Sequence, residues 1–306
     1  MRQVRVARKS NVSVEEIARE HLHGLGSPVI ITDGIDHWPA RSKWTFEFFK
    51  NYYGSDFASA WLGTGSDIGK ITKLATYIDF LDKPLEQLPG IWVGKDGLPI
   101  KVAPAPGASP LYLVGWNAFQ HPELYRDITP APYFVLDLVS ALSPTLREIL
   151  EWTSRRSFTA VYIGPAGSLS RLHRDYWETH AYLAQIQGRK RAILFSPDDS
   201  DFLYNGQVEP EQPDFGRFPL FKRATAYECV IEPGDTLLLP ANWWHYVKGL
   251  EKSITVSHNF FNDTNLSGYM TTILRNLPAL MQALEQSSKW REELCIQWGL
   301  PNITPS

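Results

Sequence analysis

Three residues in the central part of the chain carry side chains that together could bind a divalent metal ion. His173 and Asp175 lie two positions apart, and His245 follows much later, shortly after the apolar run TLLLP. In a strand, side chains at i and i+2 project from the same face, so His173 and Asp175 can share one wall of a cavity. Two imidazoles and one carboxylate on one face of an octahedron are typical of non-haem Fe(II) sites, which keep three positions open for other ligands.

An ordinary structural role is the alternative for these residues. An isolated His-x-Asp pair arises often by chance, and it then forms a surface contact or a hydrogen-bonded pair rather than a metal site. The interpretation as metal ligands therefore depends on whether the rest of the chain supplies the other parts of a catalytic site.

Lys190 is the first such part, because it is placed to bind an anion. The segment GRKRAILF alternates so that Lys190 shares a strand face with Ala192 and Leu194, whereas Arg189 and Arg191 face the other way. A lone lysine on an apolar face is costly unless an anion meets it. We therefore expect Lys190 to point inward; the alternative is a register shifted by one residue, which would place it outside.

Other polar and aromatic residues could complete the site. Ser170 lies three positions before His173, and Tyr112 and Asn259 could contribute further polar groups, although each alone is equally compatible with an ordinary turn, rim or strand position. Four aromatic residues flank the presumed ligands and could either wall the pocket or pack in the core: Tyr176, Trp177, Trp243 and Trp244.

The region that carries these residues is predicted to be a series of short strands. Between residues 158 and 261 the β-type runs are FTAVYIG, HAYLAQIQG, RKRAILFSP, YECVIEPGD, TLLLP and SITVSHNFF. Turn signals such as Pro233-Gly234-Asp235 separate them at short intervals. This pattern favours an antiparallel double sheet, a jelly roll or a small barrel, over alternating βαβ units.

Helical periodicity flanks this β-rich centre. On its N-terminal side, helices are predicted at 13–23, 45–53, 74–81 and 143–152, with a short strand at 28–32 and with strands and loops at 91–110. On its C-terminal side, an apolar stripe at 269–284 and a last helix at 287–299 are predicted. We expect a mainly β catalytic domain at 1–262, including the N-terminal elements, and a C-terminal helical extension at 263–306.

Composition limits the class of protein. The 306 residues are 43% hydrophobic, their formal net charge is −3, and the two cysteines are too few for a disulfide framework. A global basic field for nucleic acid is absent. No apolar run approaches the ~18 residues that a membrane span needs, and the N-terminus MRQVRVARKS lacks the apolar core of a signal peptide. We therefore expect a cytoplasmic protein, or a nuclear one if the source is eukaryotic, with no membrane partner and no clear nucleic-acid partner.

The motifs together resemble those of the JmjC (cupin-8) hydroxylases. The resemblance is carried by SRLHRD, then QGRKRAILF, then EPGDTLLLPANWWHYV and SITVSHNFF, and SPVIITDGIDHWPA matches the usual beginning of the family. It runs from about Gly26 to Asn262. Within the family the chain is similar to the asparaginyl hydroxylase that inhibits hypoxia-inducible factor. The resemblance implies a double-stranded β-helix core of the jelly-roll or cupin type.

The resemblance also implies a reaction. His173, Asp175 and His245 would be the catalytic Fe(II) ligands, and Lys190 would pair with the distal carboxylate of 2-oxoglutarate. Residues expected near this co-substrate are Lys190, Tyr112, Ser170 and Asn259. With O₂, the reaction would hydroxylate a side chain of a protein or peptide and release succinate and CO₂.

Substrate identity is not carried over. The spacing from His173 to Lys190 is longer than in the asparaginyl hydroxylase, and the enlarged region, Tyr176-Trp177-Glu178, should lie at the mouth of the pocket. A small molecule or modified nucleoside as substrate, or demethylation, stays open. So does a cupin metalloenzyme without 2-oxoglutarate, in which Lys190 has no role, and a binding scaffold. A homodimer through the C-terminal helices is a further expectation.

Overall fold

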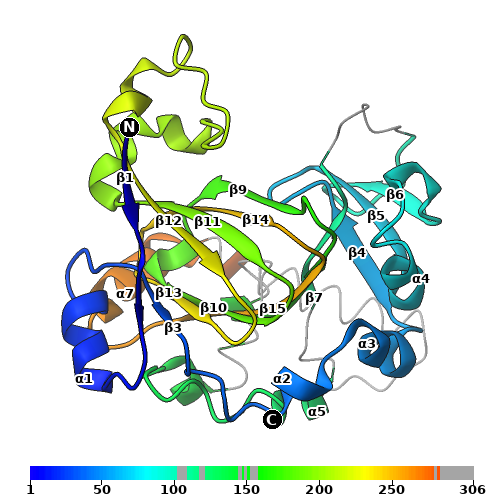
Figure 1. Cartoon of the computed structure of the whole chain (residues 1–306), viewed down its shortest axis with the longest axis horizontal. Coiled ribbons are helices and arrows are strands. Elements are labelled where there is room, and N and C mark those ends of the chain that lie inside the picture. The colour runs from blue at the N-terminus through cyan, green and yellow to red at the C-terminus, as the bar shows by residue number, and fades with distance from the viewer. Residues whose placement is uncertain are drawn as a thin grey trace.

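The computed structural model describes residues 1–101, 109–116, 121–143, 147, 150–151, 158–278 and 281–282. Two β-sheets form the centre of the molecule (Figure 1). The strands of the larger sheet, in chain order, are β2 (Ala7–Lys9), β3 (Val29–Ile31), β4 (Phe57–Trp61), β5 (Ile68–Lys73), β6 (Ile91–Gly94), β7 (Tyr112–Trp116), β8 (Thr159–Gly164), β10 (His180–Gln187), β13 (Thr236–Leu239) and β15 (Ser253–Phe260). Those of the smaller sheet are β1 (Arg2–Arg5), β9 (Leu169–His173), β11 (Lys190–Phe195), β12 (Thr225–Ile231) and β14 (Trp244–Gly249).

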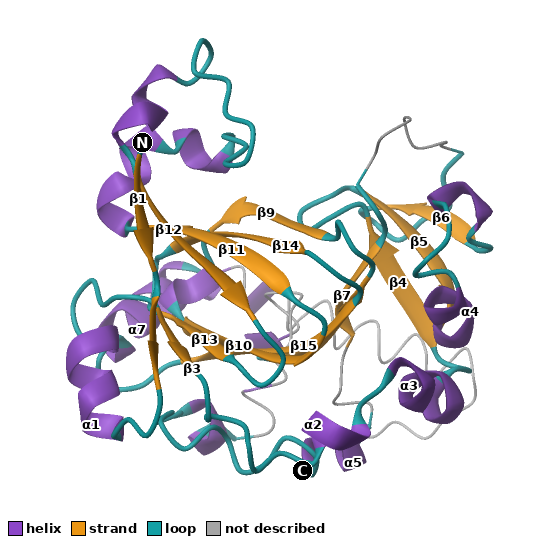
Figure 2. Ribbon diagram, viewed as in Figure 1, coloured by secondary structure: helices purple, strands orange, loops and turns teal. Residues whose placement is uncertain are grey.

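The chain crosses repeatedly between the two sheets from β8 to β15. The larger sheet has the order β2-β3-β13-β10-β15-β8-β7-β4-β5-β6, and the smaller has the order β1-β12-β11-β14-β9. Figure 2 shows the smaller sheet above β13, β10 and β15. The pairs within this central part are antiparallel. The predicted antiparallel double sheet, with its jelly-roll core, is confirmed.

Side-chain alternation explains how the two sheets close over one interior. Ala192 and Leu194 of β11 pack with Leu237 and Leu239 of β13 between the sheets. The alternate residues of β11 face outward: Ile193 and Phe195 lie in a second cluster beneath the segment that joins β11 to β12. That segment contains the 3₁₀ helices η6 (Pro197–Phe202), η7 (Tyr204–Gly206) and η8 (Pro219–Arg223).

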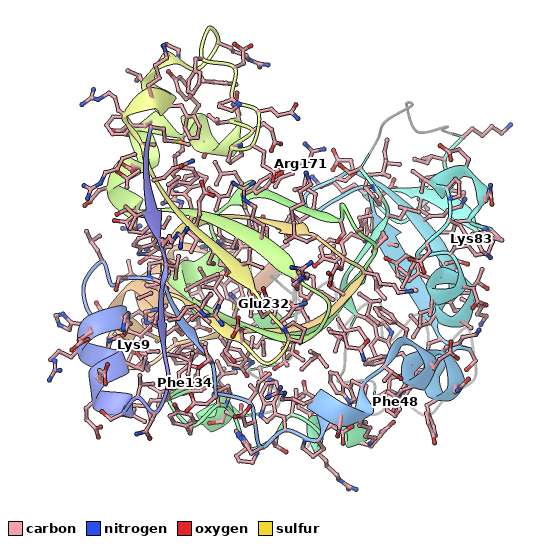
Figure 3. The ribbon with its side chains drawn as sticks, viewed as in Figure 1. Lys9, Phe48, Lys83, Phe134, Arg171 and Glu232 are labelled. Atoms are coloured by element: carbon pink, nitrogen blue, oxygen red, sulfur yellow. The ribbon has the colours of Figure 1, made fainter. Side chains whose placement is uncertain are left out.

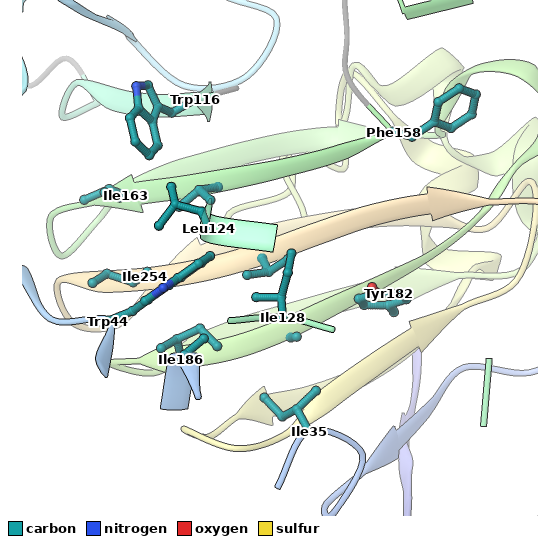
Figure 4. Close-up of a cluster of buried hydrophobic side chains, with 14 of the residues drawn as sticks. Ile35, Trp44, Trp116, Leu124, Ile128, Phe158, Ile163, Tyr182, Ile186 and Ile254 are labelled. Atoms are coloured by element: carbon teal, nitrogen blue, oxygen red, sulfur yellow. The ribbon is translucent and has the colours of Figure 1, made fainter. Parts of the chain in front are cut away.

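Helices from the N-terminal half cover the outer face of the larger sheet. They are α2 (Ala40–Lys43), α3 (Phe46–Tyr53), α4 (Leu74–Asp79) and α5 (Pro122–Tyr125), together with the 3₁₀ helices η2 (Leu85–Gln87) and η4 (Val139–Ala141). Figure 4 shows the resulting core, in which Trp44, Leu124 and Ile128 pack over Ile186 and Ile254 of the sheet. The helices predicted at 45–53 and 74–81 are thus confirmed, with Thr45 capping the first of them by accepting a hydrogen bond from the Phe48 N–H.

The N-terminal helix is more irregular than its pattern suggests. α1 (Val14–Glu16) begins where Ser13 Oγ accepts from the Glu16 N–H, and it continues as the π-helix η1 (Ile17–Leu22). The strand predicted at 28–32 is β3. The helix predicted at 143–152 lies largely outside the described residues, as do most of 280–284 and all of 287–299.

One C-terminal helix, α7 (Leu266–Arg275), is described. Its inner face carries Tyr269, which is buried and stacks on Phe261 at 4.1 Å between ring centroids. Ile273 is half-buried against the same core, whereas the following apolar residues of α7 and of the described positions after it are exposed: Leu266, Met270, Leu274, Leu277 and Met281. A homodimer through this face, and the domain boundary at 262, stay predictions. None of the described helices is long and apolar enough to cross a membrane.

Tyr77 offers a test of how the outer helices hold the strands that carry the site. Its buried hydroxyl accepts from the Leu113 N–H and shares its one proton between the carbonyls of Leu111 and Ile163, which ties α4 to β7 and β8. Tyr77→Phe leaves buried backbone groups short of a partner, so the free energy of unfolding should fall by about 1–3 kcal/mol in urea denaturation. Tyr52→Phe, at a tyrosine that is 74% exposed, is the matched control and should change little. Equal values for the two variants would contradict this account.

Candidate metal and co-substrate site

Strand pairing brings the two histidines together. β9 and β14 are antiparallel neighbours, and His173 lies directly opposite His245 in their register. Asp175 follows the end of β9. Its Oδ1 lies 3.8 Å from His173 Nε2 and 3.7 Å from His245 Nε2, and one ligand atom from each of the three residues lies within 4.8 Å of the others. The structure therefore assembles the predicted group of one carboxylate and two imidazoles.

Hydrogen bonds to the backbone orient both imidazoles. His173 Nδ1 lies 2.6 Å from the Arg171 carbonyl oxygen, and His245 Nδ1 lies 3.2 Å from that of Trp243. Since a carbonyl oxygen only accepts, Nδ1 carries the proton in each ring and Nε2 keeps its lone pair, directed toward Asp175. This donor set fits a divalent metal of the Fe(II) type, since the backbone fixes the tautomer that metal binding needs.

Asn259 orients the carboxylate. Its Nδ2 donates to Asp175 Oδ2 at 2.9 Å and to Thr179 Oγ1 at 3.0 Å. Oδ2 is therefore engaged away from the imidazoles, which leaves Oδ1 facing them. The sequence placed Asn259 beside the co-substrate; the structure also gives it a contact with a predicted metal ligand.

The three predicted ligands line a cavity of about 770 Å³. Lys190, Tyr112, Ser170 and Asn259 line the same cavity, so all seven predicted site residues lie around one space. Val247, Leu183 and Leu239 add apolar wall. The roles of these residues toward a metal and a co-substrate stay predictions, but their convergence is a property of the fold.

Lys190 points inward, as the alternation of β11 predicts. Its side chain is buried, and Nζ donates to Tyr112 OH at 2.8 Å. Among the described residues Lys190 forms no ion pair with a carboxylate, whereas its outward neighbours do: Arg191 pairs with Glu228 and Arg189 with Glu251. Burial lowers the pKa of Lys190 to about 7. Burial also raises the pKa of Tyr112 well above its ordinary value, so its phenol stays neutral.

The aromatic residues near the ligands separate into wall and core. Tyr176 lines the cavity and is 60% exposed, so it lies at the mouth. Trp243 and Trp244 are buried and do not line it. Their indole N–H groups donate to the Leu25 carbonyl at 2.7 Å and to Ser200 Oγ at 2.9 Å. For these two tryptophans the core-packing alternative holds.

A second wall of the cavity was not predicted from the sequence. The tip of the β4–β5 hairpin, residues 63–67, lines the cavity and attaches to the edge of β9, which carries His173. The Thr64 N–H donates to the Leu169 carbonyl at 2.9 Å, and Thr64 Oγ1 accepts from the Arg171 N–H at 3.1 Å. Figure 3 labels Arg171 on this strand at the upper rim of the molecule. The run of Gly63 to Asp67, Gly-Thr-Gly-Ser-Asp, is a turn signal that could have revealed this hairpin.

Comparison with known proteins agrees with this geometry. Residues 129–266 match the model of the family described as cupin-like domain. The chain carries a cupin-like domain over these residues. It is 32% identical over 251 residues to lysine-specific demethylase 8 of Xenopus tropicalis, covering 78% of this chain and 49% of that protein.

Two further relatives have names that state other activities. The chain is 28% identical over 195 residues to the 2-oxoglutarate and iron-dependent oxygenase JMJD4 of Danio rerio, covering 60% of this chain and 43% of that protein. It is 27% identical over 267 residues to tRNA wybutosine-synthesizing protein 5 of Homo sapiens, covering 82% of this chain and 76% of that protein. The chain spans about half the length of the first relatives it matches. The finer likeness to the asparaginyl hydroxylase is not shown by these comparisons.

The contact between Asn259 and Asp175 yields a prediction about metal affinity. Asn259→Ala removes the donor on Oδ2 and frees the carboxylate to turn, so the dissociation constant for Mn(II), a redox-inert substitute for Fe(II), should rise about 10–100-fold. Isothermal titration calorimetry measures it. Ser257→Ala, two residues away on the same cavity-lining face of β15, is the control and should bind Mn(II) like the wild type. An unchanged constant in Asn259→Ala would show that the amide does not position the ligand.

Proposed function

We propose that the protein is an Fe(II)- and 2-oxoglutarate-dependent oxygenase that hydroxylates a side chain of a protein or peptide and releases succinate and CO₂. The observation that carries this proposal is the buried Lys190. It faces the same cavity as the group of His173, Asp175 and His245 and has no carboxylate partner among the described residues.

The position of Lys190 distinguishes this function from other cupin chemistry. A metalloenzyme without an anionic co-substrate has no use for a buried ammonium group, and the desolvation of that group destabilises the fold unless an anion offsets it. A dicarboxylate meets both ends of the site: one carboxylate can pair with Lys190 and Tyr112 while the 2-oxoacid end reaches the metal ligands. The printed name of the Danio rerio relative, a 2-oxoglutarate and iron-dependent oxygenase, supports the same assignment.

Each group of site residues has its own role in the proposed reaction. The imidazoles of His173 and His245 and the carboxylate of Asp175 would hold Fe(II). With O₂ as the oxidant and 2-oxoglutarate as the two-electron reductant, the bound metal would allow one oxygen atom to enter a substrate C–H bond and the other to enter succinate. Asn259 keeps Asp175 in the orientation that leaves Oδ1 available. Lys190 and Tyr112 fix the far carboxylate of the co-substrate. Tyr176 and the tip of the β4–β5 hairpin form the walls past which a substrate side chain must enter, so they restrict which C–H bond is presented.

Hydroxylation and demethylation share this chemistry, because N-demethylation begins with hydroxylation of a methyl C–H bond. The names of the relatives favour neither: one is a lysine-specific demethylase and another an oxygenase. We favour stable side-chain hydroxylation on the sequence motifs. A modified nucleoside is the second candidate substrate, supported by the name of the human relative, a tRNA wybutosine-synthesizing protein.

A mass-spectrometric assay tests the proposed reaction. The iron-loaded protein is incubated with 2-oxoglutarate and, in parallel, with a peptide library, methylated histone peptides or total tRNA. We expect succinate to form with the peptides and one oxygen atom to be added to a side chain, and the His173→Ala variant to do neither. Formaldehyde release with loss of a methyl group would show that the reaction is demethylation rather than stable hydroxylation. Turnover with tRNA alone would show that the substrate is a nucleoside rather than a peptide.

The lowered pKa of Lys190 predicts how co-substrate binding depends on pH. Above its pKa of about 7 the free lysine is mostly neutral, and it must take up a proton to pair with a carboxylate. Between pH 7 and pH 9 the affinity of the Mn(II)-loaded protein for 2-oxoglutarate should therefore fall, by up to about tenfold per pH unit. Calorimetry in two buffers of different ionisation enthalpy should detect proton uptake.

Lys190→Arg is the matched control for this titration. A guanidinium stays charged throughout that range, so the variant should show weaker binding with little dependence on pH. The aromatic groups in contact with Lys190 Nζ are Tyr112 and Tyr162. A flat profile for the wild type, without proton uptake, would contradict the assignment of Lys190 as the carboxylate partner.

A further inference from the structure

The turn that follows Asp175 has an unusual backbone. It comprises η5 (Tyr176–Glu178), and two consecutive non-glycine residues in it are left-handed: Trp177 has φ 62° and Glu178 has φ 54°. Bulky L-residues adopt this conformation only when their surroundings hold them there, because each such residue costs free energy.

The base of the turn is held by Asn259. This residue donates both to Asp175, before the turn, and to Thr179, after it. Thr179 Oγ1 also donates to the Tyr176 carbonyl at 3.2 Å. These bonds close the loop, but they do not reach its tip, where the two left-handed residues lie.

The tip is held by helix α7 through Glu178. Asn265 Nδ2 donates to the Glu178 carbonyl at 2.7 Å, and Thr272 Oγ1 donates to Glu178 Oε1 at 3.3 Å. The Glu178 carboxylate packs over Gly268, where it occupies the space that the Cβ of a larger residue would need. Next to it, the Trp177 ring meets the buried Tyr269 edge-on, with 6.5 Å between centroids. Four residues of α7 or its N-cap thus contact two consecutive residues of the turn.

We propose that Glu178 is a positioning residue for the metal site, and that α7 sets the direction of Asp175 through it. The turn is short, so its tip cannot relax without moving the carboxylate three residues before it or the exposed Tyr176 at the cavity mouth. Because Gly268 has no side chain, it leaves the space that the Glu178 carboxylate fills. This inference rests on the proposed role of Asp175 as a metal ligand.

Gly268→Ala tests the proposal without weakening the helix. Gly268 has an ordinary helical backbone, and alanine is the better helix former, so α7 itself should gain stability. The new methyl group displaces the far end of the Glu178 side chain. We expect the dissociation constant for Mn(II), followed by the EPR signal of the free ion, to rise about tenfold. The melting temperature of the metal-free protein should stay unchanged or increase.

Three further variants give the control and the rescue. Ser267→Ala changes the neighbouring, exposed position of α7 and should leave Mn(II) affinity unchanged. Glu178→Ala should weaken Mn(II) binding as Gly268→Ala does. Glu178→Gln keeps the size and the acceptor oxygen for Thr272 and should restore affinity close to that of the wild type.

The outcomes separate this inference from the proposed function. If the wild type binds no Mn(II), the proposed function fails and this inference with it. If the wild type binds Mn(II) and both Gly268→Ala and Glu178→Ala bind it equally well, only the positioning role is wrong. If the melting temperature of Gly268→Ala falls in parallel with its Mn(II) affinity, the contact between Glu178 and Gly268 contributes to stability alone, and the positioning role is wrong.

Discussion

The register between β9 and β14 is the constraint on which the site depends. It places His173 opposite His245 on a face that looks into the space between the sheets. A slip of one residue would turn every side chain of β9 to the opposite face and separate the imidazoles. β9 is an edge strand, and Thr64 at the tip of the β4–β5 hairpin occupies its free side. Two hydrogen bonds between Thr64 and the backbone of β9 help to hold this register. The hairpin that lines the cavity therefore also supports the strand that carries a ligand.

A second constraint is the charge at the far side of the cavity. Arg189 and Arg191 face outward and pair with carboxylates, whereas Lys190 faces inward, where its ammonium group donates to the Tyr112 hydroxyl and lies near the rings of Tyr112 and Tyr162. Burying the charged form of a lysine in such surroundings costs free energy, and pairing it with an anionic ligand reduces that cost. Lys190 and His245 lie on neighbouring strands, β11 and β14, and His173 lies on β9, the next strand of the same sheet. One sheet thus fixes the separation between the proposed metal site and the proposed carboxylate site.

Much of this arrangement could be predicted because it is local. The strands between 158 and 261 show as apolar runs bounded by turns, and the inward direction of Lys190 follows from its neighbours Ala192 and Leu194. In the hairpin of β4 and β5, the turn run from Gly63 to Asp67 is a signal, but the hydrophobic pattern of the strands is not. In β4 the small residues Ala58 and Ala60 are buried, whereas Phe57 is 68% exposed and covered by the ammonium group of Lys73. Its hydrophobic pattern is therefore inverted, and periodicity does not reveal which face is inside.

The contacts that tune the site could not be predicted for a different reason. Asn259 is distant in sequence from Asp175, and the bond between them depends on β15 lying beside β10 and on the path of the turn that joins β9 to β10. The hydrogen bond between Glu178 in that turn and Thr272 in α7 likewise joins residues that are distant in sequence. Trp243 and Trp244 show the converse: they adjoin His245 in sequence, yet the chain directs both indoles into the core. Proximity in sequence to a ligand does not place a residue in the cavity.

The central claim is that one cavity binds a metal at His173, Asp175 and His245 and a 2-oxoacid that reaches Lys190. An anaerobic titration of the Fe(II)-loaded protein with 2-oxoglutarate, followed by the visible metal-to-ligand charge-transfer band, tests it most directly. We expect a saturable band that is absent in His173→Ala and that needs a much higher 2-oxoglutarate concentration in Lys190→Ala. Iron binding without any such band in the wild type would contradict the account and favour a cupin metal site of another reaction class.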